Sequence, residues 1–282
     1  MTAWYRRALF AALVCGLLAE LSDPVAAQPL SPARQRQVLR EALALYDEAV
    51  AVSRTDPTQA AEMFRRSAAG LLALRAAGVR NAALEYNLGN VYFRLGELGR
   101  AVLHYRRAEQ LSPHDHRLRA NLRYARQRVE PNIAPSGQSR LVRQLAFWHY
   151  QTSPRQRFWA LIVLSSIGWS LLFAWLLRGY RLVAAGGLIC VLLGLGSAAS
   201  LLWQMVDERR HPHAVVINSE AYLRLGRGMG ADLALKQALG PGVELRILRR
   251  HGEWVEVQLP SEQTGWLPAD SLELVGEAAP EN

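Results

Sequence analysis

Hydrophobic residues are spread unevenly along the chain and fall mostly into three blocks. The first is a short apolar run near the N-terminus, Ala8 to Ala19. The other two are long and uncharged, Phe158 to Leu177 and Leu182 to Met205. Blocks of this kind indicate a membrane protein rather than a single soluble core. Between the first and second blocks the pattern predicts helices, and after residue 214 it predicts short strands.

The N-terminal block has the features of a secretory signal. Arg6 and Arg7 precede the apolar run, and residues 25–27 (Val-Ala-Ala) supply the small residues that signal peptidase accepts. The run is too short to span a bilayer comfortably. We expect residues 1–27 to direct export, with an uncleaved anchor as the alternative interpretation.

The segment 28–128 predicts a helical domain. Ser31-Pro32 and Asp56-Pro57 each combine a capping residue with a proline, which is typical of a helix start. The predicted helices are 32–53, 57–77, 82–95, 98–111 and 115–128.

The third and fourth predicted helices carry the spacing of a tetratricopeptide (TPR) repeat. Gly89 and Ala101 are small enough to let the two helices approach closely, while Tyr92 and Tyr105 fill the gap. Glu85 stands where the motif has tryptophan, and the helix pair before it is degenerate. The prediction is a short α-solenoid, an architecture that presents a concave face to partners. The motif residues are Leu88, Gly89, Tyr92, Ala101, Tyr105, Ala108 and Pro113.

Four polar residues are candidates for lining that concave face. Asn87 and Asn90 lie about one turn apart on one helix, and Arg117 and Asn121 occupy a similar register on the following helix. Together they could hold a partner's backbone or a carboxylate, because arginine donates a planar fork of hydrogen bonds. In the alternative interpretation the asparagines cap and bridge within the stack.

The two long apolar blocks, 158–177 and 182–205, predict a transmembrane hairpin. The turn between them is so short that both flanking regions must lie on one side of the membrane. Arg178 and Arg181 in that turn suit the cytoplasmic side, so we expect the flanking domains outside the cytoplasm of a bacterial inner membrane. Arginines also flank the outer ends of the spans, and the signal segment decides the orientation because a long exported domain translocates largely regardless of charge.

Two further features belong to this region. Residues 129–157 predict a linker followed by an interfacial segment rich in apolar and aromatic residues, or a simple spacer. The second span carries a face of small residues for close helix packing, against the first span or against a helix of another protein. That face consists of Gly186, Cys190, Gly194 and Ala198.

Residues 206–282 predict a small β domain. Short strands are expected at 214–217, 221–225, 243–248, 253–259, 264–267 and 272–275, separated by glycine- and proline-containing turns. Five or six short strands in this length suggest a small barrel. Trp254 and the Gly265-Trp266 pair resemble a bacterial SH3-like domain. We expect Trp254 in the core, while Trp266 suits either the core or a ligand groove.

Composition and motifs narrow the function further. The net charge of +9 comes almost wholly from arginine, but no basic stripe with interleaved aromatics suits nucleic acid. No catalytic, nucleotide or dinucleotide motif is present in the sequence, so we expect no enzyme and no cofactor. The pairs His114/His116 and His211/His213 imply no third metal ligand, and we predict no metal site.

The order of signal, TPR-like helices, paired spans and SH3-like domain resembles the BatE family of bacterial aerotolerance operons. The residues that carry the resemblance are the Asn87–Asn90 motif, the runs 98–101 and 105–108, and Asn121-Leu122. The resemblance covers nearly the whole mature chain. It implies membrane complexes with von Willebrand A-domain proteins and, through them, a MoxR-type AAA+ ATPase.

The function expected from these observations is a non-enzymatic, membrane-anchored scaffold. Its helical groove would bind a partner protein in an envelope stress complex. The alternative is a cell-wall module in which the SH3-like domain binds peptidoglycan peptides.

Overall fold

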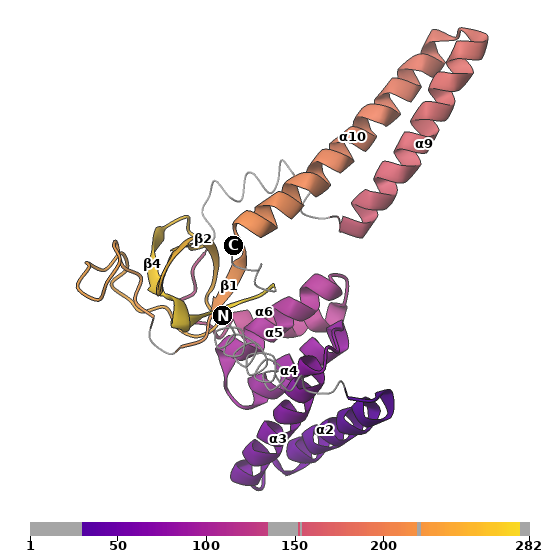
Figure 1. Ribbon diagram of the computed structural model, residues 1–282. Helices are drawn as coiled ribbons and strands as arrows, with labels where there is room; N and C mark the ends of the chain where they lie inside the picture. Colours follow the sequence, from indigo (N-terminus) through magenta and orange to yellow (C-terminus); the bar gives the residue numbers. More distant parts are fainter. Residues whose placement is uncertain (1–29, 135–151, 153, 219–220, 277–282) are drawn as a thin grey trace, which may run out of the picture.

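The computed structural model describes residues 30–134, 152, 154–218 and 221–276 (Figure 1). The expected signal segment, 1–27, and the interfacial part of the expected linker lie outside the described residues. Five helices come first, then two long helices, then a five-stranded sheet.

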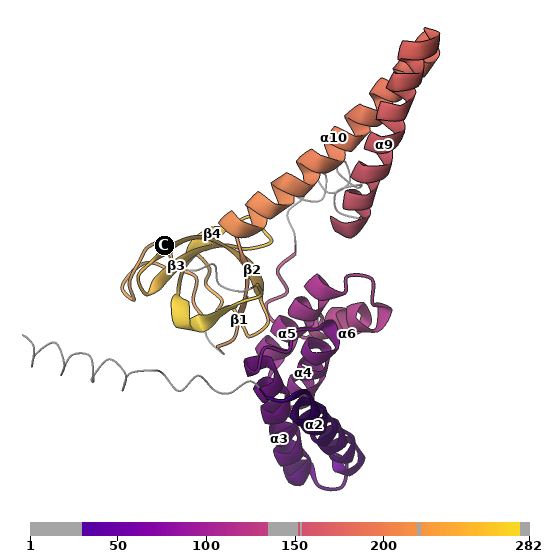
Figure 2. The ribbon, with the colours of Figure 1, turned by 45° about the vertical axis from the view of Figure 1, so that its right-hand side comes forward.

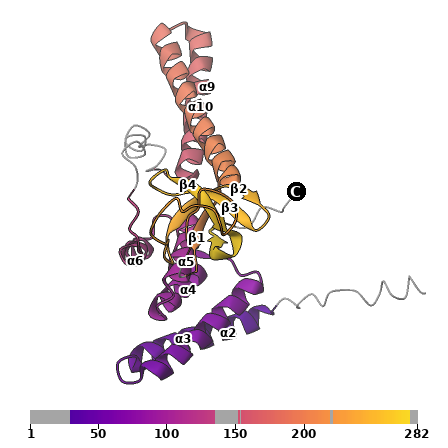
Figure 3. The same ribbon diagram turned by 90° about the vertical axis from the view of Figure 1, so that its left-hand side faces the viewer.

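The helical region consists of five helices, each packed on the next (Figure 3). Local signals set their starts: the side chains of Ser31 and Asp56 accept hydrogen bonds from the backbone of Arg34 and Gln59. All five lie within two residues of the predicted bounds. They are α2 (Pro32–Val52), α3 (Pro57–Ala76), α4 (Ala82–Arg94), α5 (Leu98–Leu111) and α6 (His116–Arg126).

The close packing of α4 on α5 follows from the small residues of the predicted motif. A Cβ at Gly89 would lie 2.5 Å from Cδ1 of Tyr105, so only glycine leaves room for the tyrosine ring. Leu88, Ala101 and Ala108 are fully buried in the same contact. The packing is that of a helical hairpin, and its assignment as a TPR repeat stays a prediction.

Two long helices, α9 (Pro154–Arg178) and α10 (Arg181–Arg210), form an antiparallel hairpin that projects from the rest of the molecule (Figure 1). Residues 156–178 and 181–207 are long and apolar enough to cross a membrane. Large apolar side chains such as Trp169 and Leu182 are 65% and 89% exposed in the protein alone. Since the hairpin leaves so much apolar surface uncovered, the helices are candidate membrane spans.

The helices of the hairpin meet through small residues, but on a slightly different face from the predicted one. A Cβ at Gly187 would lie 3.1 Å from the carbonyl oxygen of Gly168, and one at Gly194 would lie 2.9 Å from Oγ of Ser165. At Gly186 the nearest atom would be 3.8 Å away. Gly194 therefore belongs to the contact as expected, while Gly187 rather than Gly186 makes the close approach.

Polar side chains form hydrogen bonds between the two helices near the base of the hairpin. Nη1 of Arg157 donates to Oγ of Ser200 at 2.6 Å, and Nη2 donates to the side chain of Gln204. Arg157 is only 4% exposed. The arginine that the sequence places at the membrane edge is therefore part of the helix–helix contact.

The C-terminal region is an antiparallel sheet with strand order β4-β3-β2-β1-β5. It differs from the expected barrel in being open, with β4 and β5 at its edges. The expected strand at 221–225 makes only isolated bridges, at Ala221 and Arg224. Three glycines, at 226, 228 and 230, follow that segment, and glycine weakens a strand. The strands are β1 (His213–Val216), β2 (Glu244–His251), β3 (Trp254–Gln258), β4 (Thr264–Pro268) and β5 (Leu272–Leu274), with a short 3₁₀ turn, η1 (Ala269–Ser271).

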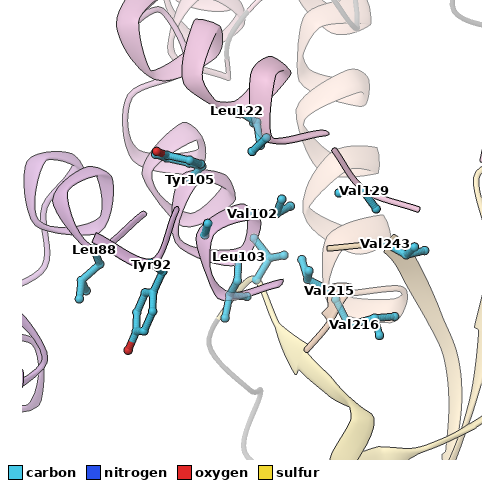
Figure 4. Close-up of a cluster of buried hydrophobic side chains, with 14 of the residues drawn as sticks. Leu88, Tyr92, Val102, Leu103, Tyr105, Leu122, Val129, Val215, Val216 and Val243 are labelled. Atoms are coloured by element: carbon cyan, nitrogen blue, oxygen red, sulfur yellow. The ribbon is translucent and has the colours of Figure 1, made fainter. Parts of the chain in front are cut away.

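The sheet packs directly on the helical region, which the sequence analysis did not foresee. It lies beside α5 and at the base of α10 (Figure 2). Val102 and Leu103 of α5 belong to one buried cluster with Val215 and Val216 of β1 (Figure 4). A Cβ at Gly99 would lie 2.7 Å from the carbonyl oxygen of Val216, so the helix and strand backbones are in close contact. The regions before and after the hairpin therefore share one core.

Candidate functional site

A groove of about 520 Å³ lies in the helical region. Its walls come from α2, α4, α5 and α6, and one residue just beyond α6 completes it. The lining combines aromatic rings, amides and guanidinium groups. The lining residues are Tyr46, Asn90, Phe93, Arg94, Tyr105, Asn121, Tyr124 and Arg128.

Hydrogen bonds between side chains connect the helices that line the groove. Oδ1 of Asn90 accepts from the hydroxyl of Tyr105 at 2.8 Å and from Nδ2 of Asn121 at 3.0 Å. Nδ2 of Asn121 also donates to the hydroxyl of Tyr86 at 3.0 Å. Burial raises the pKa of Tyr105, which keeps its hydroxyl a donor. The two asparagines therefore bridge α4, α5 and α6, as the alternative interpretation of the sequence held.

Two arginines give the groove its charge. Arg94 is exposed at the end of α4. Arg128 lies over the rings of Phe93 and Tyr124, with its guanidinium carbon 5.0 Å and 4.5 Å from the two ring centres. Within the described residues, neither arginine forms an ion pair and no carboxylate lines the groove. The groove thus carries positive charge that the described part of the chain does not neutralise.

The four predicted site residues have different positions. Asn90 and Asn121 line the groove. Asn87 lines a smaller cavity next to it, together with Tyr46 and Ser67. Arg117 is exposed on α6, about one turn before Asn121, and is not among the groove-lining residues.

The aromatic and cationic residues of the groove were not predicted from the sequence. Under the predicted TPR spacing, Arg94 and Arg128 are one period of about 34 residues apart. Residues one period apart lie in equivalent positions of successive repeats and therefore face the same side of a solenoid. Phe93 and Tyr124 carry no comparable spacing.

Glu85, where the motif would have tryptophan, belongs to a buried polar network behind the groove. Its carboxylate oxygens lie 2.7 Å from Nδ1 of His104 and 3.1 Å from Nε of Arg75. The ring of Tyr92 stacks on His104, with ring centres 5.3 Å apart. The buried carboxylate of Glu85 therefore has two polar partners, on α3 and α5.

The charge states within the network follow from burial and pairing. Burial alone would raise the pKa of Glu85, but the hydrogen bond with His104 and the positive charge of Arg75 outweigh it and lower the pKa. Burial lowers the pKa of His104 and exceeds the opposing effect of Glu85. The network therefore holds an ionised carboxylate beside a neutral imidazole, and it fixes α3, α4 and α5 behind the groove.

Ion pairs join the back of the helical region to the sheet. The carboxylate of Glu244 in β2 lies 2.6 Å from Nε of Arg126 and 2.9 Å from Nε of Arg106. Arg107 donates to the carbonyl oxygens of Leu274 at 2.7 Å and Val275 at 3.2 Å. Because α5 and α6 supply both groove residues and these sheet contacts, the groove is held at a fixed position on the sheet.

The contact between the helical region and the sheet should make the fold sensitive to acid. Burial lowers the pKa of His213 in β1 to about 4, helped by Arg106 and Arg246 and opposed by Glu244 and Asp207. An unfolded histidine titrates near about 6.5. Between these values the unfolded chain binds more protons, so the free energy of unfolding falls as the pH is lowered through this window. We expect His213 to contribute a loss of about 2–3 kcal/mol.

Urea unfolding of the detergent-solubilised chain, at about pH 7 and about pH 4.5, tests this expectation. His213→Gln should show a smaller difference between the two conditions than the unsubstituted chain. His251→Gln changes an exposed histidine of β2 and serves as the control. The free energy of unfolding could have the same pH dependence in all three proteins. That result would contradict the role of His213 and would point to His104, which also has a lowered pKa and is unchanged in each protein.

The two tryptophans of the predicted SH3-like motif lie on neighbouring strands. Trp254 pairs with Pro268 at the start of β3, and its side chain is partly exposed rather than in the core as expected. Trp266 of β4 is also partly exposed, and the guanidinium carbon of Arg227 lies 5.6 Å from its ring centre. Trp266 therefore faces a surface that a ligand could reach.

Comparison of the chain with protein-family models, with curated proteins and with solved structures found no match. The resemblance to the BatE family and the TPR assignment stay predictions.

Proposed function

We propose that the protein is a membrane-anchored scaffold whose groove between α2, α4, α5 and α6 binds a partner protein. The supporting observation is the pair of arginines without carboxylate partners among the described residues, Arg94 and Arg128, set among the aromatic side chains that line the groove. Aromatic residues and arginine are the residue types enriched at protein-binding sites.

The connection to the membrane helices gives the groove a defined place. Helix α10 runs into β1 after only two intervening residues, and Asp207 of α10 pairs with Arg246 of β2. Strand β1 in turn packs on α5. A partner bound in the groove would therefore be held at a fixed distance from the membrane.

The proposed setting is a complex in the bacterial inner membrane, with the helical region and the sheet on the extracytoplasmic side. The resemblance to the BatE family suggests von Willebrand A-domain proteins as partners and a MoxR-type ATPase acting through them. The TPR-like and SH3-like assignments belong to this proposal.

Affinity capture of the tagged full chain from crosslinked membranes tests the scaffold function. In Phe93→Ala/Tyr124→Ala, which removes two aromatic walls of the groove and leaves both arginines, we expect recovery of the main partner to fall about tenfold or more. Leu72→Ala/Leu111→Ala removes two exposed apolar side chains outside the groove and serves as the control. Equal recovery with both double variants would contradict groove binding.

Binding to the cell wall through the sheet is the second candidate function. It is favoured by exposed apolar side chains in the segment next to Trp266, among them Leu225 and Met229, which are 66% and 72% exposed. Sedimentation of the full chain with purified cell wall, lost in Trp266→Ala, would favour this candidate over the groove.

A further inference from the structure

We propose that the groove recognises an extended peptide segment through a carboxylate, with Arg94 and Arg128 as the cationic contacts. This inference rests on the proposed function, because it specifies the chemistry of the partner at the same groove. The carboxylate can come from an acidic side chain or from the C-terminus of the partner.

Charge complementarity supports this ligand. Three carboxylates of α4 and α5 or the turn between them are already paired elsewhere: Glu85 with Arg75, Glu97 with Arg100, and Glu109 with Arg106. Among the described residues, no carboxylate forms an ion pair with Arg94 or Arg128 and none lines the groove. A guanidinium group presents a planar fork of donors that matches a carboxylate. An anionic ligand would supply the partner that both arginines lack.

Arg128, one of the two groove arginines, is already held in place before a ligand binds. Arg128 stacks over Phe93 and Tyr124, and its Nη2 donates to the hydroxyl of Tyr124. A side chain held in place before binding loses less conformational entropy when a ligand arrives. Among the described residues, Arg94 has no such ring contact, and its side chain is exposed.

The side-chain amides of Asn90 and Asn121 favour a peptide over a small anion as the ligand. Oδ1 of Asn90 accepts two hydrogen bonds, and both hydrogens of Nδ2 of Asn121 are donated. The groups that remain are the donor Nδ2 of Asn90 and the acceptor Oδ1 of Asn121. A peptide unit offers the complementary pair, a carbonyl oxygen and an N–H group. A small anion such as sulfate offers acceptors for the first of these groups but no donor for the second.

The size of the groove agrees with this ligand. A volume of about 520 Å³ is in the range of sites that take a short peptide segment or a small molecule. The aromatic rings of Tyr46, Phe93 and Tyr124 provide apolar contacts for the side chains that flank the carboxylate.

A peptide selection tests the proposal with the full chain in lipid nanodiscs, since the helical region shares its core with the sheet. The probes are two random octapeptide libraries, identical except that one has free C-termini and the other has amidated C-termini. Enrichment of Asp and Glu in both libraries would identify a side-chain carboxylate as the ligand. Retention confined to the free-C-terminus library would identify a terminal carboxylate.

Charge variants decide whether the groove arginines are responsible. We expect Arg94→Gln/Arg128→Gln to bind the selected peptides about tenfold to a hundredfold more weakly. Arg66→Gln changes an exposed arginine of α3 outside the groove and should leave binding unchanged. Raising the salt from about 50 mM to about 300 mM should also weaken binding, because exposed charges are screened.

The results that would contradict carboxylate recognition differ from those that would contradict groove binding. Selected peptides that lack carboxylates and bind the arginine variants normally would overturn the carboxylate proposal. So would a selection that retains no peptide. In either case, loss of partner capture in Phe93→Ala/Tyr124→Ala would still support groove binding, while unchanged capture in that variant would overturn both.

Discussion

Replacing Leu103 with alanine should lower the free energy of unfolding by about 3–5 kcal/mol. Leu103 is fully buried on α5, in the cluster that includes Val215 and Val216 of β1 (Figure 4). Removing most of its side chain loses the transfer free energy of the apolar atoms and leaves a cavity that neighbours on two sides fill poorly. The loss is large compared with the total stability of a typical domain, about 5–15 kcal/mol.

Hydrogen exchange measured by mass spectrometry should show which helices and strands lose stability in Leu103→Ala. Because the core is shared, amides of α5 and of β1 should both exchange faster in Leu103→Ala. Leu111→Ala, on the same helix but 54% exposed, should have little effect. Faster exchange in α5 with unchanged exchange in β1 would show that helices and sheet are stabilised independently.

Arg107→Met should destabilise the contact between α5 and the C-terminal strand by about 2–4 kcal/mol. Arg107 is 8% exposed, and it donates to the carbonyl oxygens of Leu274 and Val275 and pairs with Glu273 at 3.0 Å. Methionine fills much of the same volume but has no donor. The substitution therefore leaves the carbonyl oxygen of Val275 buried without its side-chain donor.

The matched control for this experiment is Arg100→Met on the same helix. Arg100 is exposed and pairs with Glu97 on the surface, an interaction that contributes about 0–1 kcal/mol. Exchange at residues 272–275, compared between the two variants, reports the C-terminal strand directly. If Arg100→Met releases this strand as much as Arg107→Met does, the proposed role of Arg107 is wrong.

Local signals in the sequence were sufficient to predict the helices and the candidate membrane spans. The capping residues Ser31 and Asp56 determine where α2 and α3 begin, and the length of each uncharged run determines the extent of α9 and α10. Five strands were also predicted close to their observed positions. Closure of the sheet was not predictable, because it depends on whether residues 221–225 pair over their whole length.

The joining of helices and sheet could not be predicted because its signals are far apart in the sequence. Nothing near Arg107 indicates that its partners are Glu273 and Val275, and nothing near Gly99 indicates that Val216 lies against it. The residues on α5 that contact the sheet look like ordinary surface or core residues of a helical repeat. Their role appears only when both ends of the hairpin are placed together.

The candidate groove was predicted in part. The asparagines were found because short polar side chains on the first helix of a repeat are typical of concave positions. Arg117 was predicted because it shares the repeat register with Asn121 on the helix after Asn87 and Asn90, whereas the groove is lined by residues whose positions depend on how four helices pack. The aromatic partners of Arg128 depend on side-chain packing, which a pattern of spacing does not contain.

The shared core has a consequence for how the protein is made. Residues 30–134 leave the ribosome well before β1 and β5 have been synthesised, so Leu103 and Arg107 are translated long before the atoms they contact. Until the hairpin and the strands after it have been synthesised, one face of the helical region stays uncovered. A truncated product that stops within α10 would display that uncovered face permanently, which makes it a recognisable substrate for the quality-control proteases of the cell.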